Sequence, residues 1–133
     1  FKDVFETAQN PDELVVGIMI KRILGKSVFY EFKWDSELAI LNVAAITYRE
    51  GEIQKVKVAV TGLTATPILI DLTDEYYDSK GDINVFTRRV RNYIEKTYNN
   101  VAISDSRASA EYRVHISKIL ISRALMSILS ENA

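Results

Sequence analysis

The stretch from Asp105 to Leu125, DSRASAEYRVHISKILISRAL, constrains the fold more than any other part of this chain. It carries the longest helix signal in the sequence and is followed by no Gly or Pro up to Leu129. Asp105 and Ser106 are suited to cap its first turn, and Glu111 places a carboxylate near the positive end of the helix dipole. We therefore predict one long helix with a defined start, onto which the other elements pack.

The second half of this predicted helix is apolar on almost every side. One broad face contains Tyr112, Ile116, Ile119, Leu120 and Ala124. The far side adds Ile121, Leu125, Ile128 and Leu129. A helix with this pattern is buried on more than one side. Its second side is covered either by this chain or by a partner chain, which leaves open a homo-oligomer that associates through the closing helix.

Composition narrows the class of protein. With 133 residues, 47% of them hydrophobic and 26% charged, residues 1–133 are expected to form a single globular domain. The net charge of -1 provides no basic surface for nucleic acid. The chain has no cysteine, so it supplies no disulfide, thiolate nucleophile or iron-sulfur ligand. Because it has neither a run long enough to span a membrane nor a signal peptide, we expect a cytoplasmic location.

Four strands are predicted before the helices. Leu14 to Lys21 is nearly continuous in strand-forming apolar residues, and Ser27 to Trp34 alternates with a period of two. Leu38 to Tyr48 is a third strand, and the turn at 49–52 leads to a fourth strand with alternating valines at 56, 58 and 60. Residues 61–67 form a loop because Gly62 and Pro67 interrupt regular pairing.

The remaining segments are predicted to be mainly helical. Ile68 to Tyr77 is ambiguous between a short strand and a helix that begins near Asp71. Asp82 is suited to cap a helix in which apolar residues recur at helical spacing up to Tyr98. The predicted fold class is therefore α+β, an antiparallel four-stranded sheet covered on one face by two to three helices.

Several kinds of active site find no support in the sequence. His115 is the only histidine and has no second ligand at helical spacing, so we interpret it as a structural or surface residue. No G-x-S-x-G turn is present, and the five glycines are all isolated, which excludes recognised nucleotide-binding loops. Arg88, Arg89 and Arg91 are interpreted as the solvated face of a helix rather than an anion-binding patch.

Four motifs in order resemble one known family. Family members read D-x-R-(G/A)-S-A-E-Y-R where this chain has Asp105 to Arg113. Pro11 to Leu14, Glu37 to Ala44 (ELAILNVA) and Gly62 to Pro67 (GLTATP) resemble three further family motifs. The chain thus resembles the C-terminal domain of the FAD-binding medium subunit in the carbon monoxide dehydrogenase and xanthine dehydrogenase family of molybdenum hydroxylases.

The resemblance implies a fold, a cofactor and partners. In this family the domain follows an FAD-binding domain that is expected to be absent from this sequence, so FAD is held mainly elsewhere and none is expected on this chain alone. The implied partners are that FAD-binding domain, an iron-sulfur small subunit and a molybdenum-cofactor large subunit. The implied role is to help enclose the flavin and to assemble the electron-transfer complex. The alternative is a stand-alone binding or assembly module of the same fold without a redox role.

The predicted cofactor-binding residues lie on two stretches that antiparallel pairing brings to one end of the sheet. They are Lys33, Trp34, Glu37, Gly62, Leu63, Thr64, Ala65 and Thr66. A large aromatic surface, a cation and loop donors suit a planar hydrogen-bonding ring such as a flavin. In the other interpretation the threonines only satisfy turn amides; the resemblance favours the flavin. The sequence departs from the family pattern at Lys33-Trp34, Glu37, Thr61 and Ala102.

Overall fold

The structure is a computed structural model that describes residues 2–3, 6–34 and 38–130. Its strands are β1 (Gly25–Phe32), β2 (Leu41–Glu50), β3 (Ile53–Thr61) and β4 (Ile68–Asp71). Its helices are α1 (Thr73–Asp78), α2 (Ile83–Tyr98) and α3 (Ala110–Leu129). The strands form one antiparallel sheet in the order β1-β2-β3-β4. The predicted α+β class is therefore confirmed, with strands first and helices after them.

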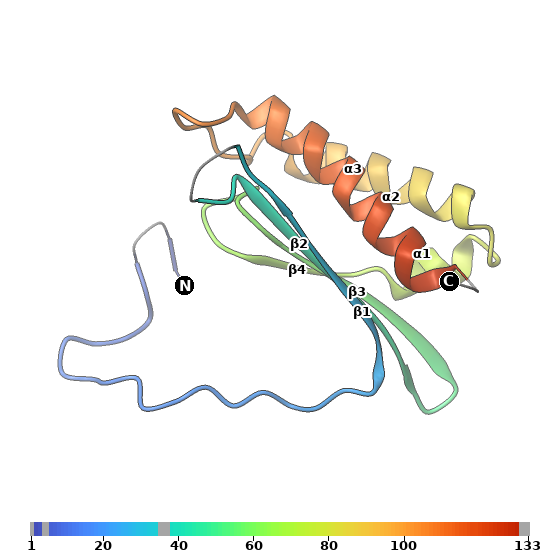
Figure 1. Cartoon of the computed structure of the whole chain (residues 1–133), viewed down its shortest axis with the longest axis horizontal. Helices are drawn as coiled ribbons and strands as arrows, with labels where there is room; N and C mark the ends of the chain where they lie inside the picture. Colours follow the sequence, from blue (N-terminus) through green and yellow to red (C-terminus); the bar gives the residue numbers. More distant parts are fainter. Residues whose placement is uncertain (1, 4–5, 35–37, 131–133) are drawn as a thin grey trace.

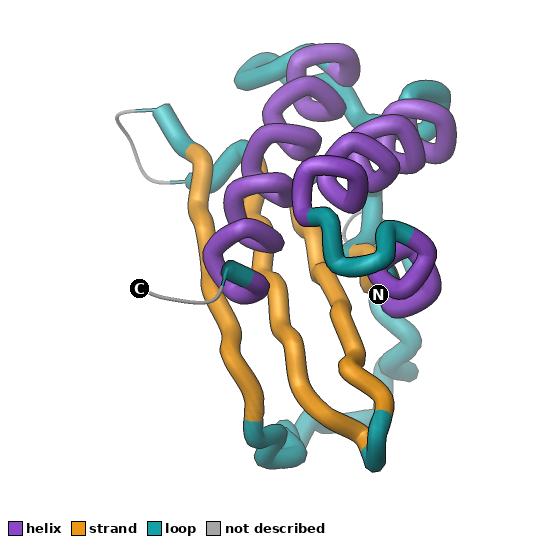
Figure 2. Tube along the Cα trace, turned by 90° about the vertical axis from the view of Figure 1, so that its right-hand side faces the viewer, coloured by secondary structure: helices purple, strands orange, loops and turns teal. Residues whose placement is uncertain are grey.

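All helices lie on one face of the sheet. Figure 1 shows α2 and α3 side by side above the strands, and the view turned by 90° in Figure 2 places them on the same side. α3 contacts β1 and β2 as well as α2, and α1 contacts both β3 and α2. None of the helices in the described part of the chain has the length and hydrophobicity needed to cross a membrane.

The predicted strand from Leu14 to Lys21 is wrong as a strand of this sheet. These residues are exposed and take part in no ladder with another described strand. The fourth strand is instead β4, so the ambiguous segment at 68–77 divides into a strand followed by the short helix α1. Propensity favours an extended backbone, but a strand also needs a partner, and the described chain provides none for residues 14–21.

The other strand predictions are confirmed with shifted ends. β2 begins at Leu41 rather than Leu38, and β1 ends at Phe32 rather than Trp34. The β2–β3 hairpin turns at Gly51, whose φ of 62° is the left-handed conformation that glycine adopts without strain. On β3, Val56, Val58 and Val60 are buried as the alternation predicts.

α2 follows its predicted pattern. The carboxylate of Asp82 accepts hydrogen bonds from the backbone N-H groups of Asn84 and Val85, which satisfies two donors of the first turn. Its buried face contributes Phe86, Val90 and Ile94 to the core, so one side of the helix packs and the other is solvated.

α3 differs from the prediction at its start. The helix begins at Ala110, and the Ser109 hydroxyl, rather than Asp105 or Ser106, caps it by accepting from the N-H of Tyr112. Its second side is covered within the chain, because α2 packs along it. Leu120, Ile121, Ala124, Leu125 and Ile128 are buried between the sheet and α2.

Candidate functional site

The predicted site residues lie at one end of the sheet. Phe32 pairs with Leu41 in the β1–β2 ladder, and Asn42 pairs with Thr61 in the β2–β3 ladder. Trp34, just after β1, and the loop that follows β3 at Gly62 therefore leave the sheet at the same end. β2 lies between them, so the two stretches are separated by one strand.

Trp34 is a partly covered aromatic side chain on this end. Its ring stacks on Tyr112 with centroids 6.0 Å apart and planes inclined by 20°. Phe32 meets the indole edge-on at 5.4 Å, and the indole N-H donates to the Arg107 carbonyl at 3.2 Å. The residue nevertheless remains 53% exposed. The indole is thus held in place by β1, α3 and the preceding loop while part of its surface stays available to a ligand.

The loop at 62–66 contributes less than its sequence suggests. The side chain of Leu63 is fully buried in the core, so only its backbone could contact a ligand. Its carbonyl accepts from the N-H of Ile103 at 3.0 Å. The Thr64 hydroxyl donates to the Thr66 carbonyl at 2.7 Å. This bond lies within the turn, which agrees with the other interpretation, in which the threonines only satisfy backbone groups of the turn. Ala65 is exposed at the loop tip.

Two charged residues were predicted beside Trp34. Lys33 is exposed and forms an ion pair with Glu31 at 3.0 Å, so its cation is shared with a carboxylate at the end of β1. Glu37 lies outside the described residues. Of the predicted set, the structure therefore brings Lys33, Trp34 and the exposed part of the loop to one end of the sheet.

Gly62 is required by its surroundings. Its φ is +82°, and a Cβ at this position would lie 2.2 Å from the carbonyl oxygen of Ile40. This close approach joins the end of β3 to the residue just before β2. Only glycine fits, because any side chain would collide with backbone that cannot move freely.

Sequence reasoning missed the group that holds this end together. Arg113 on α3 is fully buried, and its guanidinium donates to the carbonyls of Ile40 and Gly62, the latter at 2.7 Å. It also donates to Asp105 Oδ1 at 2.7 Å. One side chain thus joins the start of β2, the end of β3 and the loop before α3. The signal was an arginine flanked by Tyr112 and Val114 on an otherwise core-facing helix.

Asp105 is the acidic partner of this cluster and not the helix cap. Its carboxylate accepts from the backbone N-H groups of Arg107 and Ala108 at 2.9 and 3.1 Å, and Arg107 Nη2 donates to it at 2.7 Å. Hydrogen bonds from Arg107, and then from Arg113, hold the pKa of Asp105 well below the ordinary value of an aspartate. The carboxylate therefore stays ionised and compensates the buried charge of Arg113.

Asn42 carries an unusual polar atom beside the site. Its side-chain oxygen is buried and has no hydrogen-bond partner among the described residues. Asn42 belongs to β2 and points to the face of the sheet opposite the helices, since its neighbours Leu41 and Val43 point into the core. A buried acceptor without a donor costs free energy.

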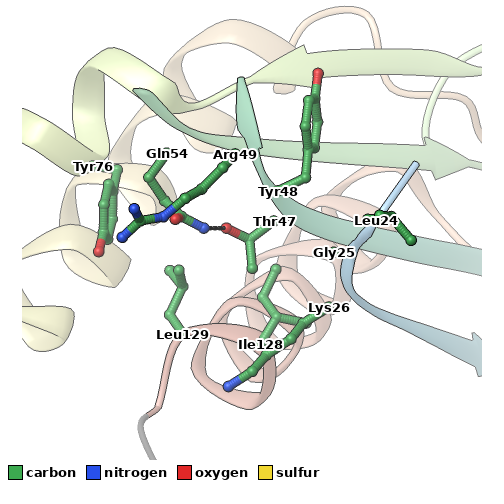
Figure 3. A pocket seen from close by; sticks show the side chains of 10 residues that line it. All are labelled: Leu24, Gly25, Lys26, Thr47, Tyr48, Arg49, Gln54, Tyr76, Ile128 and Leu129. Carbon is green, nitrogen blue, oxygen red and sulfur yellow. Dashed lines mark hydrogen bonds between the residues drawn. The ribbon is translucent and has the colours of Figure 1, made fainter. Parts of the chain in front are cut away.

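A hollow lies at the other end of the sheet, and none of the predicted site residues lines it. Its volume is about 490 Å³, and Figure 3 shows Lys26 and Arg49 at it together with the apolar side chains of Ile128 and Leu129. There Gln54 Nε2 donates to the hydroxyl of Thr47. The pairing of Gly25 with Tyr48 marks this end, opposite to Phe32 and Leu41.

Metal chemistry finds no support in the part of the chain that the structure describes. No cluster of three or more His, Cys, Asp or Glu side chains is arranged there to hold an ion. His115 is exposed on α3, in agreement with its interpretation as a surface residue.

Comparison with protein families agrees with this arrangement. Residues 31–128 match the family described as the CO dehydrogenase flavoprotein C-terminal domain. The chain belongs to this family. The match covers the whole sheet except the first part of β1, the three helices almost completely, and the end of the sheet that carries Trp34. No curated protein matches the sequence significantly.

The structure explains what the Asp105–Arg113 motif, by which the chain resembles this family, does physically. Asp105 and Arg113 form the buried ion pair, Ser109 caps α3, and Tyr112 supports Trp34. Each of these residues shapes the end of the sheet, and two of them contact predicted site residues through their side chains: Tyr112 stacks on Trp34, and Arg113 donates to the Gly62 carbonyl. The motif is therefore a framework that positions the site.

Proposed function

We propose that the chain is the C-terminal domain of the FAD-carrying subunit of a molybdenum hydroxylase of the carbon monoxide, xanthine or aldehyde dehydrogenase type. In this role it helps to enclose the flavin and to assemble the electron-transfer complex. The observation that carries the proposal is the exposed indole of Trp34, which α3 and the 99–109 loop hold at the end of the sheet within the family-matched region.

The residues of this end fit one part of FAD. An isoalloxazine ring is planar, apolar on its faces and polar along its edges, so it suits an aromatic surface beside isolated hydrogen-bonding groups. Trp34 offers the aromatic surface and Lys33 a cation.

The rest of FAD does not fit this chain. A pyrophosphate is usually held by glycine-rich backbone at a helix N-terminus, and the five glycines here are isolated. A second protein body must therefore supply the dinucleotide site, and this chain contributes only to the surroundings of the ring.

Each residue has a limited task in this proposal. FAD supplies the electron-accepting chemistry when it is bound. Trp34 covers part of the ring and excludes water from it, while Lys33 orients its polar edge. The Arg113–Asp105 pair positions both stretches by holding Ile40 and Gly62. The chain thus belongs to an oxidoreductase complex without a complete active site of its own.

The proposed partners follow from the proposed role. They are the FAD-binding domain, the iron-sulfur small subunit and the molybdenum-cofactor large subunit, and the proposed location is the cytoplasm. An enclosing domain should slow the loss of FAD and shield the ring from solvent.

The test compares the FAD-binding part of the flavoprotein alone with its assembly with residues 1–133. The two measurements are the rate of FAD dissociation and the quenching of flavin fluorescence by iodide. The proposal expects slower dissociation and weaker quenching in the assembly. Equal values in both samples would instead favour a binding or assembly module without a flavin role.

A further inference from the structure

The hollow at the end of the sheet opposite the candidate site lies next to the last turn of α3. Figure 1 shows the β2–β3 hairpin reaching beyond this turn, so the helix leaves the end of the sheet uncovered. The resulting space of about 490 Å³ is bounded by β1, β2 and the end of α3. We name it the α3-end hollow.

Two cationic side chains face the α3-end hollow from neighbouring strands. Lys26 pairs with Thr47 in the β1–β2 ladder, and Arg49 follows Thr47 by two residues on β2. Side chains alternate along a strand, and paired residues share a face. Both cations therefore lie on the face of the buried Thr47, which is the face that the helices cover. Figure 3 shows the Arg49 guanidinium on the side of Tyr76 and the Lys26 ammonium on the side of α3.

Neither cation is neutralised within the described part of the chain. The structure records no ion pair and no side-chain hydrogen bond for Lys26 or Arg49 among its described residues. The carboxylate that follows Arg49 in the sequence, Glu50, pairs with Lys55 at 3.7 Å instead. Both positive charges are thus available to an external anion.

The other polar groups of the lining satisfy one another. Gln54 Nε2 donates to the hydroxyl of Thr47, and this hydroxyl donates to the Lys55 carbonyl at 3.0 Å. A ligand in the hollow would therefore find its charged contacts at Lys26 and Arg49.

Positive charge exceeds negative charge at this end of the molecule. A second hollow of about 340 Å³ shares Arg49 with the first and is also lined by Lys21 and Arg22. The C-terminus of α3 contributes only about half a negative charge through the helix dipole, which Lys26 and Arg49 together outweigh. A concave surface lined by charges of one sign focuses the electrostatic field and attracts ions of the opposite sign. The α3-end hollow is therefore suited to an anion.

Apolar side chains form the floor and one wall of the α3-end hollow. Ile128 is buried and Leu129 is half-buried in the last turn of α3. The ring of Tyr76 on α1 is held by an edge-on contact with Phe86, with centroids 5.6 Å apart. Leu24, which is 80% exposed, adds an apolar rim. Hollows that bind small molecules combine apolar lining with a few polar groups that fix the orientation of the ligand.

We propose that the α3-end hollow binds an organic anion in which a carboxylate or phosphate group is attached to an apolar chain or ring. The anionic group pairs with Lys26 and with Arg49, whose planar guanidinium matches two oxygens of either group. The apolar part lies on Ile128 and Leu129 beside the ring of Tyr76. This site lies at the opposite end of the sheet from Trp34 and does not depend on the proposed function.

A titration of residues 1–133 with octanoate and with octyl phosphate, followed by the amide signals in nuclear magnetic resonance spectra, tests the site. Saturable shifts are expected at 24–26, 47–49 and 128–129, with a dissociation constant below about a millimolar for at least one of the two anions. The tighter of the two identifies the preferred anionic group. Signals of the loop at 62–66 should stay unchanged. If neither anion shifts the signals around the hollow, the proposal is wrong.

Two further ligands separate the charged from the apolar contribution. Acetate lacks the apolar chain, and octan-1-ol lacks the negative charge, so each should bind at least about tenfold more weakly than octanoate. Binding of octan-1-ol as tight as that of octanoate overturns the assignment to an anion. Equal binding of acetate overturns the role of the apolar floor.

Variants of the two cations test their roles. Arg49→Gln and Lys26→Gln should each weaken binding of the preferred anion by about fivefold or more, because each removes one charged contact. Arg88→Gln, at an exposed position on α2, removes the same charge elsewhere and should leave binding unchanged. Without ligand, all three variants should melt like the parent chain, because the cations are exposed and stabilise no described contact. A lower melting temperature of Arg49→Gln with unchanged affinity for the anion would assign this arginine a structural role and overturn the proposal.

A chain that ends at Ser130 completes the test, since residues 131–133 lie outside the described residues. It should bind the preferred anion at least as tightly as the full chain, because Lys26 and Arg49 supply the charged contacts. Loss of binding in this chain overturns the assignment of the anion to these two residues.

Discussion

Arg113 Nη2 lies 2.7 Å from Asp105 Oδ1, and this ion pair joins the first turn of α3 to the loop that precedes it. The arginine is fully buried, whereas 31% of the aspartate side chain remains exposed. Because Arg113 also donates to the carbonyls of Ile40 and Gly62, the pair determines where β2 begins and β3 ends. The geometry of the candidate site thus depends on a charge that the core can hold only while Asp105 is ionised.

Asp105→Ala should destabilise the fold. It leaves the buried guanidinium without its carboxylate, and we expect a loss of about 1 to 3 kcal/mol in the free energy of unfolding, moderated by the access of water to this position. Asp78→Ala is the matched control, because its ion pair with Arg89 at 3.4 Å is exposed and should contribute less than about 1 kcal/mol. Equal denaturant midpoints for the two variants would contradict the structural role of the pair.

The same pair predicts a dependence of stability on pH. The pKa of Asp105 is lower in the folded than in the unfolded chain, first through hydrogen bonds from Arg107 and then through Arg113. Its stabilising contribution is therefore complete above the unfolded pKa, near 4, and is lost as the pH falls through the folded value. Urea melts between about pH 2 and pH 6 should show a smaller acid-induced loss for Asp105→Asn than for the parent chain. Parallel pH profiles would show that Asp105 is not responsible.

Gly62→Ala should be more harmful than Gly81→Ala. Both glycines have positive φ, +82° and +81°, but only at Gly62 would a Cβ collide with the Ile40 carbonyl. Gly81→Ala should cost about 1 to 2 kcal/mol for the left-handed backbone alone. Gly62→Ala should cost roughly 2 to 4 kcal/mol because the collision adds to that strain. Thermal melts measure the difference, and similar losses for the two variants would mean that the approach of Ile40 to Gly62 is not tight.

Leu120→Ala tests the packing of α3 against the rest of the core. Leu120 is buried, so its truncation should cost roughly 2 to 5 kcal/mol. Met126→Ala, at an exposed position on the same helix, serves as the control and should cost less than about 1 kcal/mol. Denaturant unfolding followed by circular dichroism compares them; if Leu120→Ala matched the control, the helix would not pack as described.

Local patterns predicted most of the fold. The valine alternation of β3 and the capped amphipathic α2 were predictable because their determinants lie within a few residues. Residues 14–21 were predicted as a strand because propensity describes the backbone, whereas pairing depends on a neighbouring strand, and these residues pair with none of the described strands. The start of α3 was misplaced because Asp105 and Ser109 are both good caps, and the tertiary contact with Arg113 engages the first of them.

The placement of the two predicted stretches at one end of the sheet could be predicted, but the contacts of their residues could not. Antiparallel pairing alone places Trp34 and the loop at 62–66 at the same end. The burial of Leu63 could not be foreseen, because it depends on a contact between two loops that are far apart in the sequence. The loop before α3 packs against the loop at 62–66, and the N-H of Ile103 donates to the Leu63 carbonyl. The Arg113 cluster was missed for two reasons. Two of its acceptors, at Ile40 and Gly62, are far from Arg113 in the sequence, and the third, Asp105, had been interpreted as a helix cap.

Isolated residues 1–133 should bind FAD weakly or not at all. The sequence has no glycine-rich loop for the pyrophosphate, so only the ring would have a surface to contact. A fluorescence titration of FAD with the purified chain measures this. Saturable binding with a dissociation constant near a micromolar, about -8 kcal/mol, would show that the chain holds the dinucleotide by itself.

The flavin fluorescence of the assembled flavoprotein, measured for Trp34→Leu, Trp34→Phe and the parent domain, tests the central proposal most directly. If the indole covers the ring, Trp34→Leu should raise flavin fluorescence and its quenching by iodide, and Trp34→Phe should restore part of the shielding. Tyr77→Leu is the control, since Tyr77 is a half-exposed aromatic residue that contacts Gln54 at the opposite end of the sheet. Unchanged flavin emission in Trp34→Leu, in a folded assembly with full FAD content, would contradict the proposal that this end of the domain faces the flavin.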